Sequence, residues 1–197
     1  MKVRASVIKE IFRKSIHLCS GFIPLLLSFF YWPVIILLIC AVCSYSICEI
    51  LRLKGHPVPL ISVVTETAAR KRDEDKFVLG PVTLVIGIII TALVFEHEPA
   101  SVGIFALAFG DGCASLIGKI FGRVKIPHMG GKTLEGCLAC FTAVFISTLC
   151  VSGNLLISLI TALFTMLIEV LPLFDFDNII IPICTAAFYI FISGVIV

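Results

Sequence analysis

Charged residues are scarce in this sequence. Only 14% of its 197 residues are charged, whereas 59% are hydrophobic, and the mean hydropathy is +1.15. Because a soluble domain usually has about 25% charged residues and a lower apolar fraction, this composition excludes an ordinary soluble domain. The sequence therefore predicts a membrane protein, and its few polar residues are the ones to examine for function.

A complete P-loop is also missing. Residues 130–133 read Gly-Gly-Lys-Thr, like the end of a P-loop, but Ile126 stands where the motif requires a glycine, five residues before Gly131. No strand-like segment precedes this loop, so a soluble nucleotide-binding domain is not supported. What remains is a glycine-rich basic loop, in which backbone N–H groups can approach phosphate oxygens while cations neutralise their charge.

Metal-binding cysteine motifs and nucleic-acid-binding motifs are absent as well. The nine cysteines fall almost entirely within apolar runs. The pairs Cys40-x-x-Cys43 and Cys137-x-x-Cys140 have no His or Cys partners at zinc-ligand spacing, so we expect buried packing residues there. No nucleic-acid partner is predicted, because topology and anionic lipid headgroups explain the basic loops.

Long apolar runs predict an all-α polytopic membrane protein with about seven transmembrane helices in a single integral-membrane domain, 1–197. An interfacial amphipathic helix over residues 2–14 precedes them. No small-residue cleavage site follows the first run, so we expect this run to be retained. Breaks are expected at Trp32-Pro33, in an acidic turn over 96–99 and in a tight turn over 152–154; residues 60–72 can form a surface helix. The predicted spans are 15–31, 33–51, 81–95, 100–118, 136–151, 155–171 and 178–197.

All the basic residues fall on one side of this topology. With a cytosolic N-terminus, the cytosolic segments are 1–14, 52–79, 119–135 and 172–177, and they contain all 15 Lys and Arg. The positive-inside rule therefore predicts that the N-terminus and the two basic loops, 52–79 and 119–135, face the cytosol. The membrane is expected to be a bacterial inner membrane or an organellar membrane.

Four acids lie at the same predicted depth, near the cytosolic boundary: Glu49, Asp111, Glu169 and Asp177. An ionisable residue within a span costs on the order of 2.5–3.5 kcal/mol, so each is expected to face a partner or a polar cavity. Carboxylates opposite loop cations favour a site for Mg²⁺ and a nucleotide. Pairing of Asp111 with a structural Lys or Arg, and capping of the last helix by Asp177 or Asn178, are the alternatives.

The fourth predicted span carries two stripes with a four-residue spacing. Small residues at 110, 114 and 118 predict close approach of another helix. The neighbouring stripe, Asp111, Ser115 and Lys119, predicts a polar face toward the site. His17, at the same cytosolic level, can be a general base or a phosphate donor, although a lone His at a helix start can also be an interfacial residue.

Several motifs together resemble the family of CTP-dependent lipid-alcohol kinases, which includes dolichol kinase, phytol kinase and the CTP-using diacylglycerol kinase and is distantly related to phosphatidate cytidylyltransferases. The motifs span nearly the whole chain. They are Arg13-Lys14-x-x-His17-x-x-x-Gly21, Gly110-Asp111-x-x-Ala114-Ser115-x-x-Gly118-Lys119-x-x-Gly122, Gly131-Lys132-Thr133-x-Glu135-Gly136, and Glu169-x-x-Pro172 with Asp177-Asn178 and Pro182.

The resemblance implies phosphoryl transfer from CTP to the hydroxyl of a membrane lipid alcohol, such as diacylglycerol, a polyprenol or phytol, with Mg²⁺ or a similar divalent cation. In this hypothesis the metal ligands are Asp111, Glu169 and Asp177, and one of them can instead accept the hydroxyl proton. The expected catalytic residues are Asp111, Lys132, Asp177 and His17. The expected nucleotide-binding residues are Lys14, Lys119, Arg123, Lys125, Gly130, Gly131, Thr133 and Asn178.

Three other functions are compatible with the same features. A cytidylyltransferase would use the same metal and CTP but release pyrophosphate. A transporter would place broken helices and ionisable groups near the bilayer midplane, often in repeated halves, and neither is seen. A structural scaffold leaves the collected acids unexplained, and for Lys119 and Lys125 an ordinary positive-inside loop is the simpler alternative.

Overall fold

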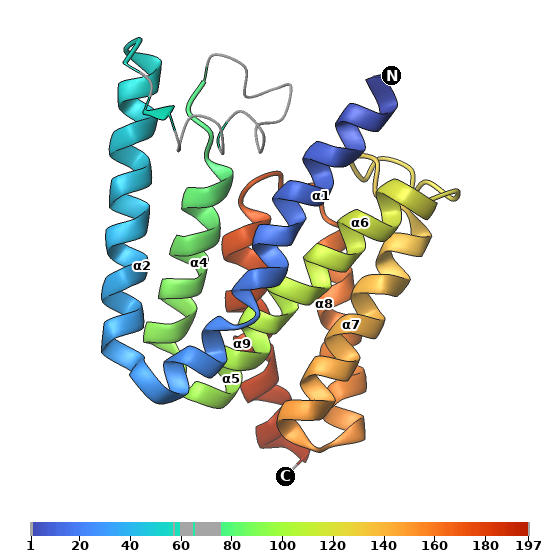
Figure 1. Cartoon of the computed structure of the whole chain (residues 1–197). Coiled ribbons are helices and arrows are strands. Elements are labelled where there is room, and N and C mark those ends of the chain that lie inside the picture. Colours follow the sequence, from blue (N-terminus) through green and yellow to red (C-terminus); the bar gives the residue numbers. More distant parts are fainter. Residues whose placement is uncertain (1, 57, 60–64, 66–75, 197) are drawn as a thin grey trace.

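The computed structural model describes residues 2–56, 58–59, 65 and 76–196, with side chains from residue 7 onward, and is entirely helical in this part of the chain (Figure 1). An isolated antiparallel bridge joins Lys125 to Thr133. The predicted surface helix over 60–72 lies almost wholly outside the described residues. The helices are α1 Lys2–Ser20, α2 Ile23–Leu53, α4 Gly80–Val94, α5 His97–Phe105, the π-helix η2 Ala106–Asp111, α6 Gly112–Phe121, α7 Leu134–Ser152, α8 Leu155–Val170 and α9 Asp177–Ile196.

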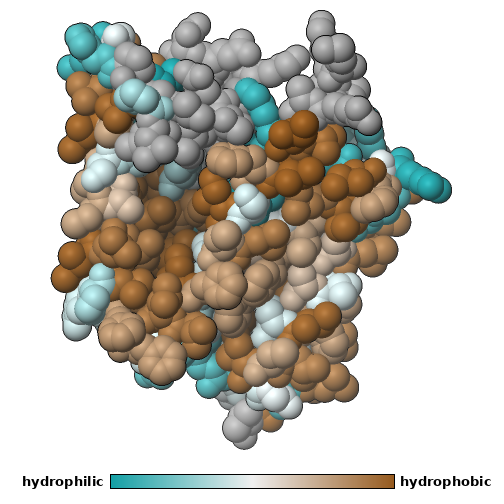
Figure 2. Space-filling view, in the orientation of Figure 1, coloured by the Kyte–Doolittle hydropathy of each residue, from teal (hydrophilic) through white to brown (hydrophobic). Residues whose placement is uncertain are grey.

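Four segments of the described chain are long and apolar enough to cross a membrane: α2, the continuous stretch His97–Phe121, α7 and α9. Two shorter helices, α4 with 15 residues and α8 with 16, are also apolar. Hydrophobic side chains cover most of the face seen in Figure 2, and hydrophilic ones gather toward its upper edge. The all-helical membrane class is thus confirmed, while the count of seven spans stays a prediction.

The N-terminal helices divide the chain differently from the prediction. Helix α1 continues to Ser20 without a boundary at residue 14, and its side chains Lys14 and His17 are buried within the bundle. The predicted break at Trp32-Pro33 is present slightly earlier in the chain, because Phe30 has a non-helical backbone (φ −138°, ψ 59°) and α2 consists of two helical parts joined at this kink. The kink precedes Pro33, whose ring crowds the backbone of the preceding turn. The interfacial placement of residues 2–14 stays a prediction.

The fourth predicted span is one continuous helical rod with a π-helical turn in its middle. It begins at His97 rather than at about residue 100, so the expected acidic turn is shorter than predicted. The π-helix η2 ends at Asp111 and is buried at every position except Phe109. Such π-turns are rare and occur frequently at functional sites. Here the irregular turn places Asp111 in the interior of the bundle.

The small-residue stripe packs as the sequence predicts. A Cβ at Gly110 would lie 2.8 Å from Val144 Cγ2, and one at Gly118 would lie 2.9 Å from Thr133 Oγ1. These glycines let α6 approach α7 closely, and the two helices are extensively packed. The neighbouring polar stripe is therefore turned away from α7.

The polar connections gather at one end of the molecule. In Figure 1 the N-terminus, the start of α4 and the loops before α7 and α9 lie at one end, and the C-terminus lies at the other. At the opposite end, Gly153 (φ 63°) ends α7, and Asn154 Oδ1 accepts hydrogen bonds from the backbone N–H groups of residues 156 and 157 to cap α8. This confirms the predicted tight turn. The cytosolic orientation of the basic loops stays a prediction.

Candidate active site

A large cavity of about 560 Å³ opens at the end of the molecule that carries the basic loops. Helix α6, the loop before α7, the end of α8 and the segment before α9 surround it. Most of the predicted site residues line this cavity: Lys119, Lys125, Gly130, Gly131, Lys132, Thr133, Glu169 and Asp177. Its volume falls in the usual range for small-molecule sites, about 300–1,000 Å³. Sequence positions far apart therefore meet at one place, as predicted.

The loop before α7 is folded back on itself and holds Lys132 in place. Ile126 N donates to Lys132 O at 2.9 Å, and Leu134 N donates to Val124 O at 2.9 Å. Between these bonds, Gly130 (φ 62°) and Gly131 (φ 89°) have left-handed backbones that other residues rarely adopt. The two glycines are thus required by the turn itself, in addition to any role in binding phosphate.

Thr133 has a structural task next to this turn. Its side-chain oxygen accepts a hydrogen bond from Gly136 N at 3.2 Å and so caps the N-terminus of α7. Threonine at an N-cap stabilises a helix by about 0.5–2 kcal/mol relative to alanine. Because Thr133 also lines the cavity, its predicted contact with the nucleotide stays a prediction.

Two lysine–carboxylate pairs form the interior of the site. Lys14 Nζ, on α1, donates to Asp111 Oδ2, and both side chains are at most 2% exposed. Lys132 Nζ, on the loop, donates to Glu169 Oε1, on α8. Removing water from two charges is costly unless both are paired and hydrogen-bonded, so each pair depends on its partner. The pairs join four segments that are distant in sequence.

Each of these carboxylates keeps a second oxygen without a partner. Asp111 Oδ1 and Glu169 Oε2 are buried, and neither has a hydrogen-bond partner in the described part of the chain. Buried polar atoms in native proteins are nearly always satisfied, and an exception calls for an explanation such as a bound ion. The alternative that Asp111 is paired with a structural cation is correct as far as Lys14 is concerned, but it leaves this second oxygen unexplained.

The charges around Lys132 show that three acids converge there. Burial by itself would lower the pKa of Lys132, but the carboxylates of Glu169, Asp111 and Asp177 outweigh burial, and the net result is a raised pKa. Lys132 therefore remains a cation throughout the physiological pH range. A permanent positive charge beside a cavity is what the binding of a phosphate group requires.

Whether this site suits a divalent cation can be judged from its oxygen atoms. Hard cations such as Mg²⁺ bind carboxylate oxygens, and Asp111 Oδ1 and Glu169 Oε2 are of this type and unpartnered. The described residues contain no group of three or more His, Cys, Asp or Glu that is arranged to hold a metal by itself. Mg²⁺ usually takes one or two carboxylates together with substrate phosphates and waters, so the residues fit a metal that arrives with a nucleotide.

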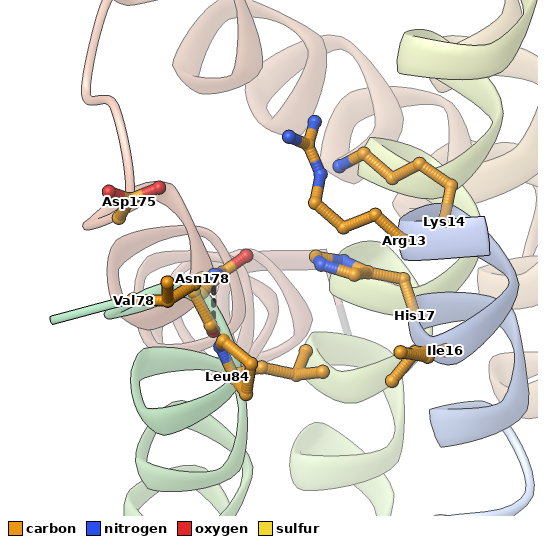
Figure 3. Close-up of a pocket in the computed structure, with 10 residues that line it drawn as sticks. Arg13, Lys14, Ile16, His17, Val78, Leu84, Asp175 and Asn178 are labelled. Carbon is orange, nitrogen blue, oxygen red and sulfur yellow. Dashed lines mark hydrogen bonds between the residues drawn. The ribbon is translucent and has the colours of Figure 1, made fainter. Parts of the chain in front are cut away.

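His17 belongs to a second, smaller cavity beside the first. Its Nδ1 lies 3.2 Å from Asp111 Oδ2. This cavity has a volume of about 30 Å³ and lies between α1 and α4 (Figure 3). The residues around it are Arg13, Lys14, Ile16, His17, Val78, Gly80, Pro81, Leu84, Asp175 and Asn178. The sequence did not predict this cavity.

Three predicted nucleotide-binding residues, Lys14, Arg123 and Asn178, lie outside the large cavity. Lys14 pairs with Asp111 and lines the smaller cavity. Arg123 is not among its lining residues, and its backbone N–H donates to Glu135 Oε1 at 2.9 Å. The side-chain amide of Asn178 donates to Thr83 Oγ1 at 2.9 Å and to Gly80 O at 3.2 Å, so it joins α9 to α4 and borders the smaller cavity instead. Loop and helix packing, which the motif order does not reveal, decides these positions.

Glu49, one of the four acids predicted at the same depth, has a structural role. It is fully buried and accepts hydrogen bonds from Arg52 Nε at 2.9 Å and from Val78 N at 2.9 Å. Arg52 also donates to Lys76 O at 3.0 Å. Glu49 therefore fixes the chain that leads into α4 and does not line either cavity.

The sequence interpretation missed Glu10, which lines the large cavity from α1. Its carboxylate contacts Arg13 Nη2 at 2.6 Å and lies 4.0 Å from Lys119 Nζ. A signal was available, because Glu10 lies four residues before Lys14 and seven before His17, on one helical face. An apolar wall formed by residues 171–174 was missed as well, and no polar motif marks it.

Comparison with known proteins adds relatives to this geometry. The chain is 30% identical over 135 residues to probable phytol kinase 1, chloroplastic, of Glycine max. The alignment covers 64% of this chain and 43% of that protein. The chain is 28% identical over 216 aligned positions to probable phytol kinase, chloroplastic, of Triticum aestivum, covering 95% of this chain and 70% of that protein. It is 28% identical over 136 residues to CTP-dependent diacylglycerol kinase 1 of Saccharomyces cerevisiae, and this alignment covers 68% of this chain and 47% of that protein.

No family model and no solved structure matches the chain. The fold and site define a helical membrane protein with a cation-lined cavity and buried lysine–carboxylate pairs. The similarity to phytol kinases and to a CTP-dependent diacylglycerol kinase confirms the resemblance to the lipid-alcohol kinase family that the motifs indicated. The chain spans less than half of the length of the soybean and yeast relatives.

Proposed function

We propose that this protein is a kinase that transfers the γ-phosphoryl group of CTP to the hydroxyl of a membrane lipid alcohol. The observation that carries the proposal is the pair of buried carboxylates, Asp111 and Glu169, each bound to a lysine and each with one oxygen that has no partner in the described residues. Glu169 lines the cation-lined cavity, and the charge of Asp111 raises the pKa of Lys132, which lines it as well. The names of the relatives support a lipid-alcohol kinase, and the yeast relative's name supports CTP as donor.

In this reaction the alcohol oxygen forms a bond to the γ-phosphorus, and the bond from that phosphorus to the β–γ bridging oxygen breaks. CDP leaves, and the hydroxyl proton passes to a carboxylate. Asp111 suits the role of proton acceptor, because it is buried and its Oδ1 has no hydrogen-bond partner in the described residues. Catalysis of phosphoryl transfer rests mainly on positioning and charge neutralisation, which the cavity residues can supply.

The triphosphate would lie in the large cavity, where Lys119, Lys125 and Lys132 offer three cations. Lys132 is bound to Glu169 in the structure, so contact with a phosphate requires it to turn from that carboxylate toward the nucleotide. The exchange keeps Lys132 paired with an anion throughout. Glu169 would then have both oxygens available.

Mg²⁺, when bound with the nucleotide, would supply neutralisation of charge on the phosphate oxygens. With Asp111 as proton acceptor, Glu169 is the residue that would hold it, because its unpartnered Oε2 is a hard donor. Asp177 lines the same cavity and is the third carboxylate that influences Lys132. These acids and the lysines that pair with them balance each other's charge before the nucleotide arrives.

The proposal is tested by a phosphorylation assay on purified protein in detergent. γ-labelled CTP and ATP are offered separately, with Mg²⁺, to phytol, a polyprenol and diacylglycerol. Label is expected in a lipid with CTP. Release of pyrophosphate on addition of phosphatidate, without label in any alcohol, would instead establish a cytidylyltransferase. Absence of both products, together with absence of CTP binding, would remove the enzymatic interpretation.

A further inference from the structure

The smaller cavity between α1 and α4 has a polar end and an apolar wall. Arg13, Lys14 and His17 extend from α1 on one side, as Figure 3 shows. Ile16 from α1 and Leu84 from α4 contribute apolar side chains to the same cavity. An amphipathic cavity of this kind suits a molecule whose polar group is attached directly to hydrocarbon.

The polar end of this cavity is formed by residues that contact the proposed proton acceptor, Asp111, which does not itself line the cavity. Lys14 and His17 both line the cavity, and both are next to Asp111 Oδ2, with His17 Nδ1 at 3.2 Å. The negative charge of Asp111 in turn raises the pKa of Lys132, which lines the large cavity. Asp111 therefore stands between the two cavities. A group in the smaller cavity would approach Asp111 past Lys14 and His17, which contact Asp111 Oδ2.

The volumes of the two cavities match two different ligands. About 560 Å³ accommodates a nucleotide, whereas about 30 Å³ does not. A single water molecule needs about 10–15 Å³, so the smaller cavity has room for a hydroxyl and one or two adjoining carbon atoms. The remainder of a hydrocarbon chain would have to lie along Ile16 and Leu84.

The wall of the smaller cavity is held rigidly on the α4 side. Glu49 Oε1 accepts a hydrogen bond from Val78 N at 2.9 Å, and the Asn178 side chain donates to Gly80 O and Thr83 Oγ1. Val78 and Leu84 are themselves buried. A wall fixed by buried hydrogen bonds keeps the shape of a subsite before the ligand binds, which lowers the cost of binding.

We propose that the cavity between α1 and α4 is the acceptor subsite, which receives the hydroxyl and first carbons of the lipid alcohol, with His17 positioning that hydroxyl against Asp111. This inference rests on the proposed function, because it assigns the acceptor of the same reaction. It divides the site into a nucleotide side bordered by α6 and α7 and a lipid side bordered by α1 and α4.

The first test narrows the subsite without disturbing its surroundings. A Cβ at Gly80, which lines the cavity, would meet nothing within 4 Å, so the first side-chain atom of Gly80→Leu has room and the added leucine lies at the cavity. The KM for the lipid alcohol is expected to rise about tenfold or more, as for other misfits in apolar pockets, while the KM for CTP stays within about twofold. An unchanged lipid KM would overturn the assignment.

A matched control is available in α9. Gly194 also has nothing within 4 Å of its Cβ position, but it lies near the opposite end of the molecule and lines neither cavity. Gly194→Leu therefore adds the same side chain to another helix and is expected to leave both KM values unchanged. A lipid KM that rises equally in both variants would indicate a general effect and contradict the subsite.

A second measurement does not depend on turnover. A lipid alcohol with a photoreactive diazirine close to its hydroxyl is irradiated with the full-length protein, and labelled residues are mapped by mass spectrometry. Label at Ile16, Pro81 or Leu84 that unlabelled alcohol displaces supports the subsite, even if no phosphoryl transfer is detected. Displaceable label confined to helices remote from this cavity, or no displaceable label, overturns the subsite while leaving measured kinase activity intact.

Discussion

The two ends of the molecule contain cavities of similar size and very different chemistry. One has a volume of about 560 Å³ and is lined by lysines, glycines with left-handed backbones and three carboxylates, of which Glu169 is buried. The other, of about 510 Å³, is bordered by Glu96, Glu98 and Tyr189, and no Lys or Arg is among the described residues that line it. Volume alone therefore does not distinguish a reaction site from a surface hollow.

The difference lies in how each end satisfies its polar groups. At the opposite end Tyr189 donates its hydroxyl hydrogen to Glu98 Oε1, a pairing that needs no ligand. At the basic end Asp111 and Glu169 are each bound to a lysine and still keep one buried oxygen without a partner in the described residues. Among the described residues that line the cavity at the opposite end, the buried polar atom that lacks a partner is the Ser193 hydroxyl oxygen, which carries no charge. Unpartnered carboxylate oxygens therefore distinguish the basic end, and a bound cation would satisfy them.

The largest expected effect comes from Asp111. Asp111→Asn removes the charge and the proton-accepting capacity but keeps the shape, so kcat is expected to fall by about 10²–10⁴-fold, the usual contribution of a general base. Lipid phosphorylation is measured by initial rates, and folding by thermal unfolding in detergent. A kcat within tenfold of the wild type would remove Asp111 from the mechanism.

Glu49 supplies the matched control for this substitution. It is also a buried acid near the same end, but its carboxylate bonds only to Arg52 and Val78 in the contacts described here. Glu49→Gln should lower the free energy of unfolding by about 1.5–3 kcal/mol, as expected for weakened hydrogen bonds to a charged group. The kcat of the folded fraction should stay within a few-fold, because Glu49 lies away from the reacting groups.

Lys132 is expected to have the second-largest effect. Lys132→Ala removes the loop cation and leaves Glu169 buried without its lysine, so kcat/KM for CTP should fall by about 10²–10³-fold, as when one transition-state charge donor is lost. Lys132→Arg keeps the charge and should recover part of the activity. Equal loss in both variants would indicate that geometry, and not charge, is what Lys132 supplies.

The raised pKa of Lys132 also predicts how CTP binding depends on pH. Its pKa is raised in the folded protein, so the cation and its stabilising pairing are fully present below the usual lysine pKa of 10.5 and are lost only as the pH rises through the raised value. No loss of CTP binding due to Lys132 is therefore expected between pH 7 and pH 10. A decline of binding within that range in the wild type, absent from Lys132→Arg, would contradict the assignment.

The sequence alone singled out most of the residues that line the candidate site, because hydropathy and charge leave few choices in a membrane protein. Asp111, Glu169 and Asp177 stand out against apolar surroundings, and the four-residue spacing of glycines correctly indicated which face of α6 packs on α7. The all-helical class follows from the same composition. These features are local or periodic, so they can be read without knowledge of tertiary contacts.

Tertiary contacts decide what the sequence could not. The predicted depth in the membrane grouped Glu49 with the acids of the candidate site, although its hydrogen bonds to Arg52 and Val78 give it a structural role. Lys14 was expected on an interfacial helix, but it reaches Asp111 because α1 packs on α6 and η2. The π-turn that orients Asp111 has no sequence signature in this chain. Ion-pair partners and irregular turns depend on packing between segments, and a hydropathy analysis considers each segment separately.

The smallest expected effect tests the opposite end. Glu98→Gln removes a charge from the second cavity but leaves an amide oxygen that can still accept the Tyr189 hydroxyl hydrogen. The kcat and both KM values are expected to stay within about twofold of the wild type, in line with surface substitutions away from a site. The measurement is the same phosphorylation assay. A large loss of kcat would mean that the end without basic residues takes part in the reaction. A rise in lipid KM alone would mean that the acceptor extends to that end, and the division of the molecule into a reacting end and an inert end would have to be abandoned.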